Sequence, residues 1–223
     1  MRTCTDRKQS TDMAHPPFVD VVSSVESLRD IMGTPSDMVV RKQLDYLDPH
    51  ARRFIERSPF LLIGTTGPDQ IGDVSPRGDA PGFVAVLDDR TLVIAERPGN
   101  RRVDTLQNIL NTGGVGLLFL VPGVEETLRV NGRASLVRDG ALLDRLVARG
   151  KRPLLAIGVE VRECFFHCAK AFKRSSLWQP DTWQGRGDMA SLAQILADQV
   201  KPANTSVQEL EAQIAESYAT RLY

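Results

Sequence analysis

The sequence predicts a mainly β domain with helices at both ends, folded as an antiparallel barrel or sandwich. Short apolar runs separated by turn residues recur between residues 60 and 166, which is the pattern of an antiparallel meander. Most connections between these runs are shorter than the dozen or more residues that a parallel crossover needs. These two observations favour an antiparallel barrel over a doubly wound parallel sheet.

The N-terminal third predicts a tail followed by short helices. Residues 1–17 have no apolar run, so we expect a flexible tail rather than a signal peptide. Ser24 is a suitable N-cap and Gly33 a suitable stop for a helix over residues 25–32. A second helix is predicted to begin at Asp48 and Pro49, because proline suits the first turn of a helix.

The central part predicts strands bounded by turn residues, with two helices inserted. A turn at 67–69 and a hairpin turn at 88–89 separate the first apolar runs, and glycines at 113–114 end a helix. Strands are predicted at residues 60–66, 71–75, 82–87, 91–95, 115–121, 126–138 and 154–164. Helices are predicted at residues 101–111, 141–148, 191–200 and 206–218.

We therefore expect three parts along the chain. Residues 1–17 form the tail, residues 18–180 form one domain with N-terminal helices, and residues 181–223 form a helical extension of that domain. The 223 residues, of which 42% are hydrophobic, are enough to bury a core without disulfide bonds.

Composition excludes several classes of function. The 28 basic and 28 acidic side chains give a net charge of zero, which argues against a general nucleic-acid binder. No apolar window is long enough to predict a membrane helix. Three cysteines fit a reducing compartment, so we expect a cytoplasmic protein. The charge is balanced only over the whole chain, however, because residues 121–180 hold eleven bases and six acids.

Two further motifs do not match the sites that they resemble. Gly113, Gly114 and Gly116 precede a predicted strand, whereas a dinucleotide-binding loop lies between a strand and a helix. The cluster of Cys164, His167 and Cys168 offers soft metal ligands, but the second ligand pair of a closed zinc site is missing. We therefore expect no metal and interpret the cysteines as buried thiols.

Two segments predict an anion-binding site. The first is residues 72–79, where Pro76 and Gly78 flank Arg77. The second is residues 96–102, where Asn100 is a suitable N-cap for a helix and two arginines follow it. A helix N-terminus offers free N–H groups, and guanidinium groups suit phosphate oxygens. The second segment therefore predicts a cradle for a monophosphate.

A simpler interpretation of the same segments stays open. The arginines can serve only to neutralise the acidic residues nearby, as surface arginines usually do. The acids concerned are Asp73, Asp79, Glu96 and Asp104.

The order of motifs resembles that of a known family. Residues 72–137 read GDVSPRGDAPGFVAVLDDRTLVIAERPGNRRVDTLQNILNTGGVGLLFLVPGVEETLRVNGRASLV. This stretch is similar to the pyridoxamine 5′-phosphate oxidase-like flavoproteins, which are antiparallel split β-barrels that bind flavin mononucleotide (FMN). The resemblance covers residues 45–170 and implies a homodimer with two FMN sites at the subunit interface.

The resemblance assigns roles to individual residues. Arg77 matches the strand arginine that contacts the flavin or its phosphate, and Asn100, Arg101 and Arg102 match a Ser-Arg-Lys phosphate turn. Ala95 replaces a hydroxyl-bearing residue, and Thr127 matches the polar residue that reaches the ring, usually from the neighbouring subunit. The cofactor-binding residues expected are Ser75, Arg77, Gly78, Asp79, Ala95, Glu96, Arg97, Asn100, Arg101, Arg102, Thr127, Arg129, Lys173 and Trp178.

The resemblance has departures at its C-terminal end. The Trp-Arg…Arg signature that holds pyridoxal phosphate is absent, and CFFHCAKAFKRSSLWQP stands in its place. Lys173 and Trp178 in this segment are candidates to complete the flavin site or a substrate pocket. Trp178 stacks on the ring or packs the C-terminal helices, and Arg129 faces either the flavin or solvent, since side chains alternate along a strand.

The function expected is that of an FMN-dependent oxidoreductase acting on an unidentified small molecule. The alternative is a dimer that binds or senses a flavin or another cofactor without turnover. A third interpretation is a dimerisation domain whose flavin site is vestigial. No catalytic residue is assigned.

Overall fold

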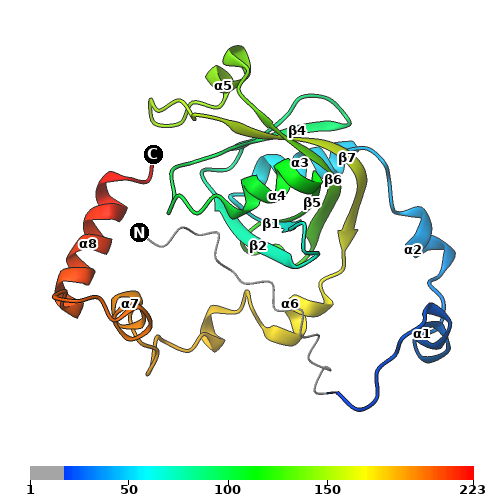
Figure 1. Ribbon diagram of the computed structural model, residues 1–223. Helices are drawn as coiled ribbons and strands as arrows, with labels where there is room; N and C mark the ends of the chain where they lie inside the picture. Colours follow the sequence, from blue (N-terminus) through cyan, green and yellow to red (C-terminus); the bar gives the residue numbers. More distant parts are fainter. Residues whose placement is uncertain (1–17) are drawn as a thin grey trace. The chain divides into compact units, whose positions relative to one another are not determined.

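The computed structural model describes residues 18–223 (Figure 1). The chain divides into two compact units, the first ending at Val40 and the second beginning at Arg41. The tail expected over residues 1–17 lies outside the described residues. The other domain bounds expected from the sequence, 18–180 and 181–223, stay predictions.

The first unit contains α1 (Val25–Met32) and most of α2 (Asp37–Arg41). The side chain of Ser24 accepts a hydrogen bond from the N–H of Ser27, and Gly33 ends the helix at φ 73°. These caps confirm the helix predicted at 25–32. Every residue from 18 to 40 is exposed.

The second unit is built on one seven-stranded sheet. Its strand order is β2-β1-β5-β6-β7-β4-β3, and every pairing is antiparallel. The order is open because β2 and β3 are its edges, so the sheet forms a split barrel, as predicted. The strands are β1 (Phe60–Thr66), β2 (Gly72–Gly78), β3 (Val84–Val86), β4 (Thr91–Ala95), β5 (Gly114–Leu120), β6 (Thr127–Val137) and β7 (Ala156–His167).

Helices lie before, between and after these strands. Asp48 caps α3 by accepting from the N–H of Ala51 at 2.7 Å, a contact that stabilises by about 1 kcal/mol. This confirms the helix start predicted at Asp48. The helices of this unit are α3 (Pro49–Arg57), α4 (Asp104–Thr112), α5 (Gly140–Arg145), α6 (Lys170–Ser175), η1 (Pro180–Thr182), α7 (Leu192–Val200) and α8 (Val207–Thr220). The sequence pattern did not predict α6.

The core lies inside the curled sheet. Apolar side chains alternate along β1 and β5, and Leu61, Ile63, Leu117 and Phe119 are almost fully buried. The alternation confirms that one face of each strand points to a common core.

The longest pairing joins β6 and β7, and a β-bulge at Asn131 and Gly132 bends it. A Cβ at Gly132 would collide with the carbonyl oxygen of Glu160. Only glycine therefore fits at this bend.

α4 packs on the end of the sheet beside β1 and β2 (Figure 1). Asn108 donates to the hydroxyl of Thr65 at 3.0 Å, and Thr112 donates to the carbonyl of Thr66 at 2.9 Å. These contacts fix the helix and, with it, the turn that precedes it.

Candidate functional site

Two ion pairs connect β2 and β4, which stand first and sixth in the sheet order. Arg77 Nε lies 3.2 Å from Glu96 Oε2, and Arg97 Nε lies 2.9 Å from Asp79 Oδ2. The four side chains are at most 23% exposed, so water screens them weakly. The sheet thus curls until the C-terminal ends of β2 and β4 lie next to each other. We call this place, where Arg77 and Asp79 meet Glu96 and Arg97, the split of the barrel.

Arg77 is held by several partners besides Glu96. Its Nη1 donates to the hydroxyl of Ser75 and to the carbonyl of Pro76, each at 2.9 Å. Ser75 also shares a 2.9 Å hydrogen bond with Thr105 of α4. Gly78 ends β2, where a Cβ would lie 3.3 Å from the carbonyl oxygen of Pro59.

The two carboxyl groups differ in their electrostatics. Burial raises the pKa of Glu96 and outweighs the attraction of Arg77. Burial would also raise the pKa of Asp79, but hydrogen bonds from Tyr223, the N–H of Ala80 and Arg97 outweigh it and lower that pKa. Asp79 is therefore ionised at neutral pH.

The turn between β4 and α4 differs from the prediction in one respect. Asn100 does not cap α4, because the helix begins at Asp104 and Val103 occupies the N-cap position without a side-chain bond. Instead, the side-chain oxygen of Asn100 accepts from the N–H of Arg102 at 3.0 Å. This local turn takes Arg101 to φ 62° and Val103 to φ 56°. Within the described residues, the first N–H groups of α4 therefore have no capping side chain.

The two arginines of this turn are exposed. Arg102 Nε pairs with Asp104 Oδ2 at 2.9 Å, with side chains 62% and 39% exposed. Such a surface pair is worth at most about 1 kcal/mol. In the part of the chain that the structure describes, Arg101 has no ion-pair partner. The simpler interpretation was that the arginines only neutralise nearby acids. It holds for Arg77, Arg97 and Arg102, and it does not hold for Arg101.

Ala95 is at the end of β4 and is almost fully buried. Its methyl group packs with Leu143 and Leu146 in a second small core. The side chain is therefore turned away from solvent.

Thr127 and Arg129 lie elsewhere, at the beginning of β6. Thr127 is opposite His167 in the β6–β7 register and Arg129 is opposite Phe165, so the four side chains share one face of the sheet. The guanidinium of Arg129 lies 5.0 Å from the centre of the Phe165 ring, a cation–π contact.

Lys173 and Trp178 are near this second group. Lys173 Nζ lies 2.6 Å from Glu125 Oε2, and this hydrogen bond raises the pKa of Lys173. Trp178 donates to the carbonyl of Val124 at 2.9 Å and stacks on Phe172 at 5.5 Å. Of the two roles considered for Trp178, these contacts favour packing.

The strand register separates Arg77 from Thr127. Arg77 is aligned across β1 and β5 with Leu128, so Arg77 faces the same side of the sheet as this core residue. Thr127 precedes Leu128 and therefore points to the opposite face. The predicted site residues thus form two groups, and one protomer does not bring them together.

The structure also separates the soft ligands at the end of β7. Cys164 is buried in the core, and burial raises the pKa of its thiol to about 12. His167 is three residues further along the strand and faces the other side. Cys168 is exposed, so the interpretation of the cysteines as buried thiols is wrong for Cys168. Among residues 18–223, no three His, Cys, Asp or Glu side chains are grouped to hold a metal ion.

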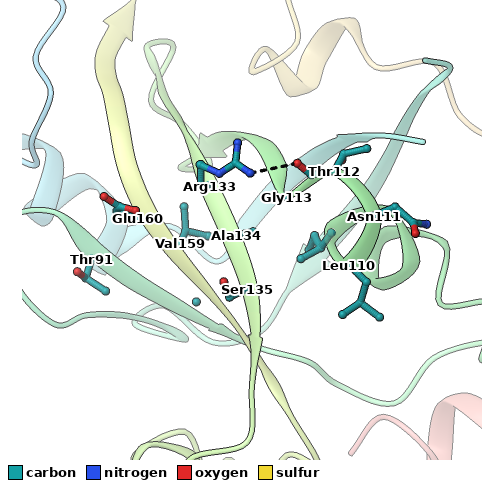
Figure 2. Close-up of a pocket in the computed structure, with 12 residues that line it drawn as sticks. Thr91, Leu110, Asn111, Thr112, Gly113, Arg133, Ala134, Ser135, Val159 and Glu160 are labelled. Carbon is teal, nitrogen blue, oxygen red and sulfur yellow. Dashed lines mark hydrogen bonds between the residues drawn. The ribbon is translucent and has the colours of Figure 1, made fainter. Parts of the chain in front are cut away.

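Two hollows mark the surface of the second unit. One, of about 470 Å³, is lined by the C-terminal end of α4 and by β6 and β7 (Figure 2). Its Arg133 donates to the carbonyl of Thr112 at 3.5 Å, as Figure 2 shows. The other, of about 550 Å³, is mostly apolar and lies beside Phe165 and Phe166. None of the predicted cofactor residues lines either hollow.

Two residues at the site are not signalled by the sequence. Thr105 bonds Ser75, and Tyr223 bonds Asp79 at 2.6 Å. The contact of Tyr223 spans 144 residues of sequence, and no local pattern predicts it.

Comparisons with known proteins agree with this architecture. A profile of the pyridoxamine 5′-phosphate oxidase family matches residues 47–168, which is more than half of the chain. The chain belongs to this family. No curated protein matches the chain significantly.

The similar solved structures share little sequence with this chain. A HupZ variant of Group A Streptococcus is 17% identical, with a TM-score of 0.45 over 54% of this chain and 99% of that chain. A putative pyridoxamine 5′-phosphate oxidase of Lactobacillus delbrueckii is 21% identical, with a TM-score of 0.44 over 56% and 98%. An FMN-binding protein of Syntrophomonas wolfei is 14% identical, with a TM-score of 0.41 over 64% and 96%.

Within residues 18–223, no helix is both long and apolar enough to span a bilayer.

Proposed function

We propose that the chain binds FMN and acts as a cytoplasmic, FMN-dependent oxidoreductase on a small molecule. The observation that carries this proposal is the turn before α4, in a chain that belongs to the pyridoxamine 5′-phosphate oxidase family. Arg101 and Arg102 are exposed there, next to helix N–H groups that no side chain caps among residues 18–223.

The donor set fits the phosphate of FMN. Two guanidinium groups and the positive end of a helix favour a dianion. The neighbouring acids do not oppose it, because Asp79 is neutralised by Arg97 and Glu96 by Arg77. Asp104 is the acid that the phosphate would displace from Arg102.

The remaining residues at the split would orient the cofactor. Arg77 is held in one position by Ser75 and Glu96, so its charge is preorganised. We assign it to the flavin or its phosphate. When bound, FMN supplies hydride or electron transfer at its ring, and the protein's part is to bind, orient and exclude water.

The two faces of the sheet support a site that is shared between two subunits. Arg77 and Thr127 point to opposite sides of the sheet, so one protomer cannot present both to one ring. We therefore propose a homodimer in which Thr127 and Arg129 of one copy complete the site at Arg77 of the other. A symmetric dimer would hold two such sites.

Absorbance of the purified protein tests this proposal. We expect flavin bands, or a gain in thermal stability when FMN is added to colourless protein. Colourless protein that gains no stability would contradict FMN binding. Bleaching of the bound flavin by a reduced nicotinamide cofactor would then favour an enzyme, and its absence would favour the non-catalytic binding dimer.

A further inference from the structure

The side chain of Tyr223 docks on the candidate site. Its hydroxyl donates to Asp79 Oδ1 at 2.6 Å. Its ring lies 5.7 Å from the guanidinium of Arg97 and 5.1 Å from that of Arg149. The carboxylate thus holds the hydroxyl of Tyr223, and the two guanidinium groups hold its ring.

The segment that carries Tyr223 is ordered by its own contacts. α7 and α8 pack on each other, and Ser191 donates to Glu211 at 3.3 Å. Ser206 and Glu209 form a capping box that begins α8, and α8 ends at Thr220, three residues before Tyr223. The hydrogen bond from Tyr223 thus ties a helical pair to the barrel.

The position of this contact relates it to the cofactor site. Asp79 follows β2, two residues after Arg77. Arg97 begins the turn that carries Arg101 and Arg102, and its Nη2 donates to the carbonyl of Leu146 at 3.0 Å. Tyr223 therefore contacts both members of the ion pair between Asp79 and Arg97, which joins the ends of β2 and β4.

We propose that residues 192–223 form a strap that closes on the candidate FMN site, with Tyr223 as its latch, so that the latch slows the release of FMN. This inference rests on the proposed function. The latch also holds the base of the phosphate turn, because Tyr223 contacts both Asp79 and Arg97.

Electrostatics agree with a latch that stays closed at neutral pH. The bond to Asp79 raises the pKa of Tyr223, with smaller opposing contributions from Arg149 and Arg97. The pKa of Asp79 is lowered, as described above. The bond therefore persists until Asp79 is protonated in acid or Tyr223 ionises in alkali.

Release of FMN from preloaded protein tests the gating role. The variant Tyr223→Phe keeps the ring and removes the hydroxyl, and Tyr218→Phe is the matched control because Tyr218 is exposed on α8. A hydrogen bond to a charged group is worth enough for about a tenfold change, so Y223F should release FMN about tenfold faster. Y218F should match the wild type. Equal release rates from Y223F and the wild type would overturn the proposal.

A second measurement needs no cofactor. Trypsin can cleave after Arg221, next to the latch, and mass spectrometry of the peptides reports cleavage of the bond between Arg221 and Leu222. We expect cleavage in the apoprotein to be several-fold faster in Y223F and in Asp79→Asn than in the wild type or Y218F. Equal cleavage would overturn the latch itself. Faster cleavage in a protein that binds no FMN would refute the proposed function and the gating role, and would confirm only the latch.

Discussion

Arg77 and Glu96 meet at 3.2 Å although their strands, β2 and β4, are separated by four other strands in the sheet. The contact therefore exists only because the sheet curls into a barrel. Both side chains are largely buried, and burial raises the pKa of Glu96 despite the neighbouring guanidinium.

Removing Arg77 should make stability depend on pH. A carboxyl whose pKa is raised in the folded state costs stability when it is ionised, so stability falls as pH rises through that pKa. In Arg77→Ala we expect this pKa to rise further and the free energy of unfolding at pH 7 to fall by about 2 kcal/mol. The loss should shrink toward pH 5. Urea unfolding at both pH values measures it.

Two controls accompany that variant. Arg53→Ala removes an exposed helix arginine paired with Glu56 and should cost little at either pH. Adding Glu96→Gln to R77A removes the unpaired charge and should restore part of the stability. An equal loss at pH 5 and pH 7 would show that Glu96 is not the cause.

Arg101 and Arg102 should distinguish FMN from riboflavin. Each guanidinium that binds the phosphate contributes a charge-assisted hydrogen bond, so the double variant to alanine should weaken FMN binding by about a hundredfold. Riboflavin has no phosphate and should bind the double variant and the wild type alike. Calorimetry with both ligands measures this, with R53A as the control. Equal losses for the two ligands would refute the phosphate assignment.

Sites shared between subunits should be recoverable by mixing. The R101A/R102A double variant and Thr127→Ala should each bind FMN weakly as homodimers. After subunit exchange, half of the dimers are mixed and each holds one intact site, so about a quarter of the wild-type sites should return. No recovery, despite exchange shown by mass spectrometry, would place all contacts within one protomer.

Gly132 should not tolerate a side chain. In Gly132→Ala the new methyl group meets the carbonyl of Glu160 at the bulge, so we expect a loss of about 3 kcal/mol in the free energy of unfolding. Gly114→Ala is the control, because a Cβ there meets nothing within 4 Å. Thermal unfolding that ranks the two variants equally would contradict the close approach of the two strands at the bulge.

The sequence predicted those features of the fold that depend on local patterns. The strands at Phe60–Thr66 and Thr91–Ala95 match the predicted bounds, since turn residues flank them. β2 extends past the predicted end at residue 75 because Pro76 is tolerated on an edge strand. The cap at Asn100 was predicted wrongly, because its side chain serves a turn before the helix.

The site was less predictable, because its contacts join residues far apart in the chain. Which acid neutralises Arg77 depends on how the sheet curls, and sequence spacing does not contain that information. The separation of Thr127 from Arg77 follows from the register of four strands. Tyr223 reaches Asp79 from the far end of the sequence, so only the tertiary structure identifies it.

Titration of the apoprotein with FMN, followed by quenching of flavin fluorescence, tests the central claim most directly. We predict saturation at one FMN per protomer, with tighter binding than for riboflavin because Arg101 and Arg102 hold the phosphate. No saturable binding, or equal affinity for FMN and riboflavin, would contradict the account.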